Sequence, residues 1–309
     1  MPMRRALLGA LLGWTVLSAA TPAAAQRTSL LLRLPASARA LALGDHLPAG
    51  YADAAGVFYE PAFLQDGGIY AGGQRYGGDA FSLDAAGAAE WLGGIAGIGL
   101  RSVDYGAVAD PRFVQVVPAD LDRAGGVAVS ERAVSLTYAH GVKRVRLGGS
   151  AKLVEERVGS SHGTGVAFDA SAGATLGLLR VALTALNLGP DVEVGGEDLA
   201  LPERYTASLT SVVPLPAGPL DLTPVLAVSR EWTGRFAPAF GLELGYYPVG
   251  GRTLYARGGV RRPPEDGTEA FTFGAGFSGD RISIDYAYEP FEDASAAHRI
   301  AVRWTAGGR

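Results

Sequence analysis

The stretch Ile282–Tyr288, ISIDYAY, decides the fold because its residues change character with a period of two. Large apolar or aromatic side chains occupy its even positions, and serine, aspartate and alanine occupy its odd positions. Successive side chains of a strand point to opposite faces, so this pattern is typical of a strand with one apolar face and one polar or small face. The same alternation continues nearby, where Ile300, Val302 and Trp304 are interleaved with arginine and alanine.

Working outward from this stretch, about fourteen segments of similar length and pattern follow one another from Gly67 to the C-terminus. Most are close to the roughly 9–11 residues that a tilted membrane strand requires. No helix, linker or second domain is predicted after Gly67. The expected strands lie near 67–76, 79–87, 95–105, 132–140, 145–157, 163–175, 179–187, 203–213, 220–230, 235–247, 252–261, 269–278, 281–289 and 297–306.

The connections between these segments alternate between short and long. Short turns are expected near 140–143, 177–178, 214–219, 249–251 and 279–280, and longer loops at 106–131, 188–202, 262–268 and 290–296. Outer-membrane barrels have short periplasmic turns and longer outer loops, whereas a soluble sandwich has no need for this parity. The sequence therefore predicts an all-β fold, a transmembrane antiparallel β-barrel of about fourteen strands, whose longest loop, Gly106 to Glu131, faces outward.

The first 25 residues have the features of a secretory signal peptide. Arg4 and Arg5 precede an apolar run from Ala6 to Ala20, and a small-residue A-x-A site ends at Ala25. The run is shorter than the roughly 20 residues of a membrane-spanning helix. The chain has no cysteine, so a lipid anchor at this site is excluded. We therefore expect a signal peptide over 1–25, an N-terminal plug or hatch segment over 26–66 and an outer-membrane β-barrel over 67–309.

Composition excludes one class of partner. Cleavage after Ala25 leaves 25 basic and 31 acidic residues, a net charge of −6, which argues against nucleic-acid binding. After the signal, no apolar run is long enough for a transmembrane helix, so membrane residence requires a closed barrel. The expected partner of the outer surface is the lipid of the bacterial outer membrane.

The alternation also predicts which side chains face lipid and which face the lumen. Charged residues of both signs fall on the polar face, where they either pair with one another or are solvated. These residues are Asp84, Arg101, Arg146, Lys152, Asp169, Arg180, Asp221, Glu243, Arg257, Asp285, Arg299 and Arg303. Aromatic residues near strand ends are expected at the membrane interfaces. They are Tyr76, Tyr105, Tyr138, Tyr246, Tyr247, Tyr288 and Trp304.

The stretch from Pro35 to Leu64 is neither a good helix nor a good strand, because it mixes small residues, glycines and the turn Glu60-Pro61-Ala62. Such a segment needs to be enclosed, and we expect it in the mouth or lumen of the barrel. The turn is either an ordinary lead into the first strand or a contact that fixes the plug to the wall. In the second case a buried Glu60 needs a basic partner, for which Arg39 is the candidate.

Two motifs resemble those of the PorV/PorQ proteins, which belong to the wider FadL/TodX group of outer-membrane barrels. The first is Ser37-Ala38-Arg39-Ala40-Leu41-Ala42-Leu43-Gly44, followed by Tyr59-Glu60-Pro61-Ala62-Phe63-Leu64. The second is Ile284-Asp285-Tyr286-Ala287-Tyr288 with His298-Arg299-Ile300. Glu60 and Phe63 depart from the asparagine and glycine of the family signature. The resemblance marks Arg39, Gly44, Glu60, Pro61 and Ala62 as a plug motif, and Asp285, Tyr286, His298 and Arg299 as a C-terminal motif.

The resemblance implies a barrel with an N-terminal plug and one of two functions. PorV-like members assist protein export in a type IX secretion system, with exported proteins or secretion components as partners. FadL-like members take up small hydrophobic compounds through the barrel wall. The first function predicts protein-binding outer loops, and the second predicts an apolar pocket beneath the plug. His46, His140, His162 and His298 have no metal-ligand spacing, and no nucleophile motif is present, so no enzyme activity, cofactor or metal is expected.

Overall fold

The computed structural model describes residues 28–305 except 52, 66–67, 77–79, 108–127, 160, 264–267 and 293–294. The expected signal peptide at 1–25 lies outside the described residues. Within the described part of the chain, every helix is too short or too polar to cross a membrane.

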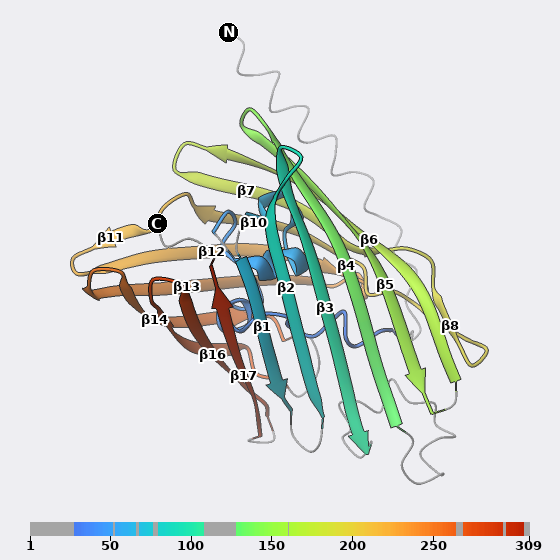
Figure 1. Cartoon of the computed structure of the whole chain (residues 1–309). Coiled ribbons are helices and arrows are strands. Elements are labelled where there is room, and N and C mark those ends of the chain that lie inside the picture. Colours follow the sequence, from blue (N-terminus) through green and yellow to red (C-terminus); the bar gives the residue numbers. More distant parts are fainter. Residues whose placement is uncertain are drawn as a thin grey trace.

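Fourteen antiparallel strands of the described chain form a closed barrel, which confirms the predicted fold (Figure 1). Each strand pairs with the next one along the chain, and the ring closes where β1 pairs with β17. The strands are β1 Gly68–Arg75, β2 Phe81–Trp91, β3 Gly94–Ala107, β4 Ala128–Val142, β5 Val145–Val158, β6 Ser161–Leu176, β7 Leu179–Leu188, β10 Arg204–Ser211, β12 Leu220–Glu231, β13 Phe236–Val249, β14 Arg252–Arg261, β15 Phe271–Ser278, β16 Ile282–Pro290 and β17 Ala296–Trp304.

Three short strands lie outside this ring. β11, Leu215–Ala217, extends the turn before β12, and β8, Val192–Val194, pairs with β9, Glu197–Leu199, in a separate hairpin. This hairpin was expected to be loop. It folds over β6, where Gly163 and Gly165 leave room for Val192 and its neighbours. A side chain at either glycine would collide with the hairpin, so these glycines allow the loop to pack into the barrel.

The two ends of the barrel differ as the connection lengths predicted. Turns of two residues join strands at one end, here called the turn end, as at 92–93, 143–144, 177–178 and 250–251. The longest connections, such as 189–203 and 262–270, lie at the opposite end, here called the loop end. Most of the predicted loop from Gly106 to Glu131 lies outside the described residues, but its limits were wrong. β3 continues to Ala107 and β4 begins at Ala128, so Glu131 belongs to a strand.

The outer surface of the barrel is apolar. Leu136 is 62% exposed, Leu183 65% and Ile300 59%, and each lies on a strand position that alternates with buried residues. A soluble protein does not normally expose so many large aliphatic side chains over a continuous surface, whereas a barrel in lipid does.

The expected aromatic belt is confirmed only in part. Tyr138, Tyr246 and Trp304 are exposed on the outer surface, but Tyr76 and Tyr105 are buried inside the barrel. For Tyr105 the reason is strand parity, because it alternates with exposed Asp104 and shares the inner face with buried Val103. Nearness to a strand end does not decide which face a side chain takes.

The N-terminal segment, residues 28–65, lies inside the ring of strands, where Figure 1 shows it in blue. Helix α2, Ala38–Ala42, begins at Ser37, whose side chain accepts a hydrogen bond from the Ala40 backbone. Two 3₁₀ turns follow, η2 Ala54–Phe58 and η3 Pro61–Phe63. All five residues of α2 and all three of η3 are buried. The segment thus reaches no solvent over most of its length.

Glycines on the inner wall make room for this segment. A Cβ at Gly97 would lie 2.7 Å from Val57, and one at Gly148 would lie 2.5 Å from the backbone nitrogen of Ala62. At the loop end, the first described residues join an apolar core, and Glu131 accepts backbone hydrogen bonds from Leu30 and Leu31. The small residues of the wall and the bulk of the segment are therefore complementary.

Candidate functional site

Inward charges of the barrel pair with one another. Arg101 lies 2.7 Å from Asp84, and Lys152 lies 2.8 Å from Asp169. Burial of these groups away from water is tolerated because each charge faces an opposite one. Pairing, rather than solvation, is therefore confirmed for much of the predicted lumenal set. The further pairs within that set are Arg257 with Glu243 and Asp285, Arg299 with Asp84, and Arg303 with Asp285.

Arg39 does not pair with Glu60, and that prediction was wrong. Its guanidinium donates to both carboxylate oxygens of Glu243, at 2.9 and 2.6 Å, and its partner is therefore on β13 of the wall. A two-point arginine–carboxylate contact fixes orientation as well as position. Arg39 thus anchors α2 to the barrel on the side of the turn end.

Glu60 lies on a different side of the lumen, where no cation of the described residues is bonded to it. One carboxylate oxygen accepts a hydrogen bond from Ser208, and the other is buried without a partner among the described residues. Burial raises the pKa of Glu60 to about 7, although the Ser208 hydrogen bond and Arg204 oppose the shift. Pro61 begins η3, and the Ala62 backbone donates to Ser171.

The four residues of the C-terminal motif divide between the two faces of the wall. Asp285 and Arg299 point inward and join the buried ion pairs. Tyr286 and His298 point outward and share a hydrogen bond of 2.8 Å. The division follows from the alternation of side chains along a strand. The four residues are therefore part of the barrel wall and do not converge on one ligand site.

A cavity of about 150 Å³ lies at the loop end, between the N-terminal segment and β10 to β14. Its rim includes Thr233 and Arg262, which are exposed, so its mouth faces the solvent beyond the loops. The walls are mostly apolar. They are formed by Leu30, Leu32, Leu34, Trp232, Ala237 and Phe291.

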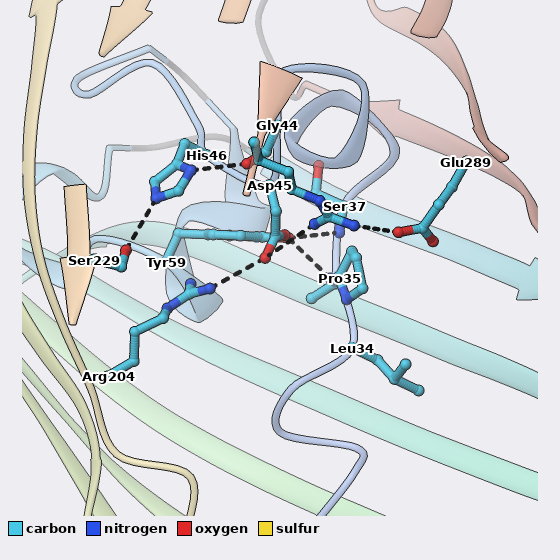
Figure 2. Close-up of polar contacts among 12 residues, drawn as sticks. Leu34, Pro35, Ser37, Gly44, Asp45, His46, Tyr59, Arg204, Ser229 and Glu289 are labelled. Atoms are coloured by element: carbon cyan, nitrogen blue, oxygen red, sulfur yellow. Dashed lines mark hydrogen bonds and ion pairs between the residues drawn. The ribbon is translucent and has the colours of Figure 1, made fainter. Parts of the chain in front are cut away.

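The floor of this cavity is polar, and Asp45 and His46 lie in it (Figure 2). Asp45 lies 3.1 Å from Arg204, accepts a hydrogen bond from Tyr59 and is 3.9 Å from Arg261. Burial by itself would raise the pKa of Asp45, but the two arginines outweigh it and lower the pKa. The carboxylate is therefore charged at neutral pH.

His46 is neutral at the same pH. Its Nδ1 contacts the Gly44 carbonyl at 3.0 Å, and its Nε2 lies 3.4 Å from the Ser229 hydroxyl (Figure 2). Burial, with a smaller contribution from Arg204, lowers the pKa of His46 to about 4. The floor thus combines matched charges with an uncharged imidazole and a hydroxyl.

Below the cavity, the N-terminal segment closes the lumen along β13. Ala237 and Ala239 line the cavity, but the next inward residue, Gly241, lies against Leu43. A Cβ at Gly241 would be 2.5 Å from the Leu43 carbonyl oxygen. Gly44 takes a positive φ of 77°, which allows the chain to turn at this contact. Further along β13, Glu243 accepts hydrogen bonds from Arg39. The segment is therefore held at β13 both by close packing at Gly241 and by this ion pair.

Most of the cavity residues were missed from the sequence. His46 was considered only as a metal ligand, and Asp45, Arg204 and Arg261 were not singled out. Arg261 occupies an inward position at the end of an expected strand, so parity alone would have placed it in the lumen. No sequence signal showed that the N-terminal segment would leave a gap beside it.

No protein-family model and no curated protein sequence matches the chain. Its fold is similar to that of the toluene transporter TbuX of Ralstonia pickettii, with 12% sequence identity, a TM-score of 0.53, and coverage of 88% of this chain and 97% of that chain. It is also similar to the deltaS2S3 mutant of TodX, a monoaromatic hydrocarbon channel, with 11% identity, a TM-score of 0.51, and coverage of 87% and 98%. These likenesses show that the chain has a FadL/TodX-like fold, and the closed ring with its apolar outer surface is that of a bacterial outer-membrane β-barrel.

Proposed function

We propose that the protein admits small hydrophobic molecules from the cell surface into the outer membrane barrel. The observation that carries the proposal is the cavity at the loop end, which has apolar walls and a mouth among exposed residues. Concave, mostly apolar sites with a few placed polar groups are typical of small-molecule sites. The two barrels of similar fold are described as a toluene transporter and a monoaromatic hydrocarbon channel, which supports this class of cargo.

In this proposal the segment over 26–66 acts as a plug. Its described residues fill the lumen below the cavity, with Leu43 against Gly241 and Arg39 bonded to Glu243. The cavity lies beside and above this contact, at the loop end, rather than beneath the plug as the sequence suggested. A molecule held in the cavity would leave through the barrel wall or after the segment has moved.

Uptake measurements test the proposal. Cells that express the protein in their outer membrane should accumulate labelled toluene at a higher initial rate than cells without it. Ala237→Trp fills the cavity and should return the rate to background. The control is Ala151→Trp, since Ala151 is exposed on β5 and alternates with inward Lys152. Equal rates for Ala237→Trp and the unmodified protein, at equal surface amounts, would contradict the proposal.

A role in protein export of the PorV/PorQ type stays a prediction. It was assigned to the outer loop from Gly106 to Glu131, and residues 108–127 of that loop lie outside the described structure. Retention of exported proteins by the full chain, lost when 108–127 is shortened, would favour it over small-molecule uptake.

A further inference from the structure

The loop-end cavity has two chemically different sides. Leu32, Leu34 and Phe291 contribute aliphatic and aromatic surface, while Arg261 and Asp45 lie at the floor. A purely apolar molecule would make no hydrogen bond to the polar floor, and a strongly polar molecule would lose its hydration against the apolar walls. A ligand that matches both sides therefore has an apolar part and a polar group.

The charges around the cavity are balanced. Among the described lining residues there are four arginines and four acidic residues. At the floor, Arg204 pairs with Asp45, and Arg261 pairs with Glu289. At the rim, Arg33 stacks over Trp232 at 5.3 Å, and Glu231 pairs with Arg235. The cavity therefore offers no excess positive charge to an anionic ligand and no excess negative charge to a cationic one. A charged ligand would lose its hydration without gaining an opposite charge in return.

One donor at the floor is left over. The Nε of Arg261 is buried and has no hydrogen-bond partner among the described residues, although the terminal nitrogens of the same guanidinium face Asp45 and Glu289. Arg261 is 8% exposed. A buried donor without an acceptor is costly, and an oxygen supplied by a ligand would remove that cost. The neighbouring His46 is uncharged at neutral pH, so it adds no positive charge that would favour an anionic ligand.

The size of the cavity limits the ligand. A cavity of about 150 Å³ lined by aliphatic and aromatic side chains is sufficient for benzene. A single ring with one small substituent therefore fits, whereas a long acyl chain would extend beyond the cavity.

We propose that the cavity selects a neutral single-ring molecule bearing one hydroxyl, ether or carbonyl oxygen, with its ring against Leu32, Leu34 and Phe291 and its oxygen accepting from the Arg261 Nε–H. This inference rests on the proposed function and narrows its class of cargo. It differs from a site for plain hydrocarbon, which would need no donor, and from a site for carboxylates, which would need a surplus cation.

Four probes of nearly equal size test the proposal with the full chain in lipid nanodiscs at pH 7.5. Toluene and phenol exchange a methyl for a hydroxyl, anisole has an oxygen that only accepts, and benzoate is an anion. An apolar cavity would bind toluene about tenfold more tightly than phenol, because the hydroxyl loses its hydration. Calorimetric titration should instead show phenol and anisole binding at least as tightly as toluene, and benzoate at least tenfold more weakly than phenol.

Arg261→Lys keeps the positive charge facing Glu289 and Asp45 but removes the Nε–H. In this variant toluene should bind as before, and phenol should become about tenfold weaker than toluene. Arg157→Lys, an exposed change on β5 outside the cavity lining, should leave the order of the probes unchanged. If Arg261→Lys does not give a heat-modifiable folded barrel, anisole is measured with the unmodified protein, and binding of anisole tenfold weaker than that of toluene would overturn the proposal.

The outcomes separate the two proposals. If toluene binds and exceeds phenol and anisole by tenfold, small-molecule uptake stands and the oxygen-selective floor is overturned. If benzoate binds most tightly, the balance of charges does not control selection and the inference is also overturned. If no probe binds, or if Ala237→Trp leaves all binding unchanged, the cavity is not a ligand site and the proposed function falls with it.

Discussion

Both halves of the N-terminal segment pack closely against glycines of the wall, but among the described residues only the first half is also held there by ion pairs. Residues 36–46, the charged half, are fixed by Arg39 on Glu243 and by Asp45 on Arg204. Residues 54–64, the fitted half, are fixed by side chains and backbone that enter glycine-lined hollows of the wall, as at Gly97 and Gly148. Ion pairs specify direction and partner, while close packing specifies shape. A short segment with little secondary structure is thus positioned mainly by the wall around it.

The largest expected effect comes from removing the partner of the charged half. Glu243→Gln leaves the Arg39 guanidinium, and part of that of Arg257, buried without a carboxylate. Loss of one member of a buried pair costs about 3–5 kcal/mol. Urea titrations in lipid vesicles should show this decrease in the free energy of unfolding. The control is Glu155→Gln at the exposed pair with Arg157, for which about 0–1 kcal/mol is expected.

Glu60 is the exception within the fitted half, because it is a buried carboxyl to which no cation in the described part of the chain is bonded. Its pKa is about 7 when folded and 4.5 when not, so the folded protein holds more protons between these values. Its contribution to the free energy of unfolding therefore falls as pH rises from 4.5 to 7. Glu60→Gln should raise the free energy of unfolding at pH 8 by on the order of 3 kcal/mol and leave it unchanged below pH 4.5. An equal effect at both pH values would show that charge is not the cause.

His46, at the end of the charged half, should respond to pH with the opposite sign. Its pKa falls from 6.5 to about 4 on folding, so the folded protein holds fewer protons in that range. Stability from this group is complete above pH 6.5 and is lost as pH falls towards 4. His46→Gln should remove this loss, so stability should rise less with pH between 4 and 6.5 in the variant than in the unmodified protein. If His46→Gln and Glu60→Gln change the slope of stability against pH in the same direction, this assignment is refuted.

The smallest effect is expected in the fitted half. Gly148→Val places a Cβ 2.5 Å from the Ala62 nitrogen. This nitrogen belongs to the backbone, so it cannot relieve the contact by a change of side-chain rotamer. Overpacking of this kind costs about 1–3 kcal/mol. Gly258→Val provides the control, since a Cβ there meets nothing within 4 Å. If both variants lose the same free energy of unfolding, valine in the strand rather than contact with the segment is responsible.

The barrel could be predicted from the sequence because strand parity is a local property. The same alternation that placed Asp285 inward and Ile284 outward identified the strands and most of the lumenal charges. The Arg39–Glu60 pair failed because contacts of the N-terminal segment depend on its position against the wall, which no local pattern encodes. The β8–β9 hairpin was missed because its strands have three residues each, too few for a period to be read. The cavity is a gap between elements distant in sequence, so it required the assembled fold.

Arg299 joins three parts of the chain that are made at different times. It belongs to β17, the last strand, and donates to Gln74 on β1, to Asp84 on β2 and to the Pro35 carbonyl of the N-terminal segment. Closure of the wall between β1 and β17 and retention of the enclosed segment therefore depend on the same guanidinium.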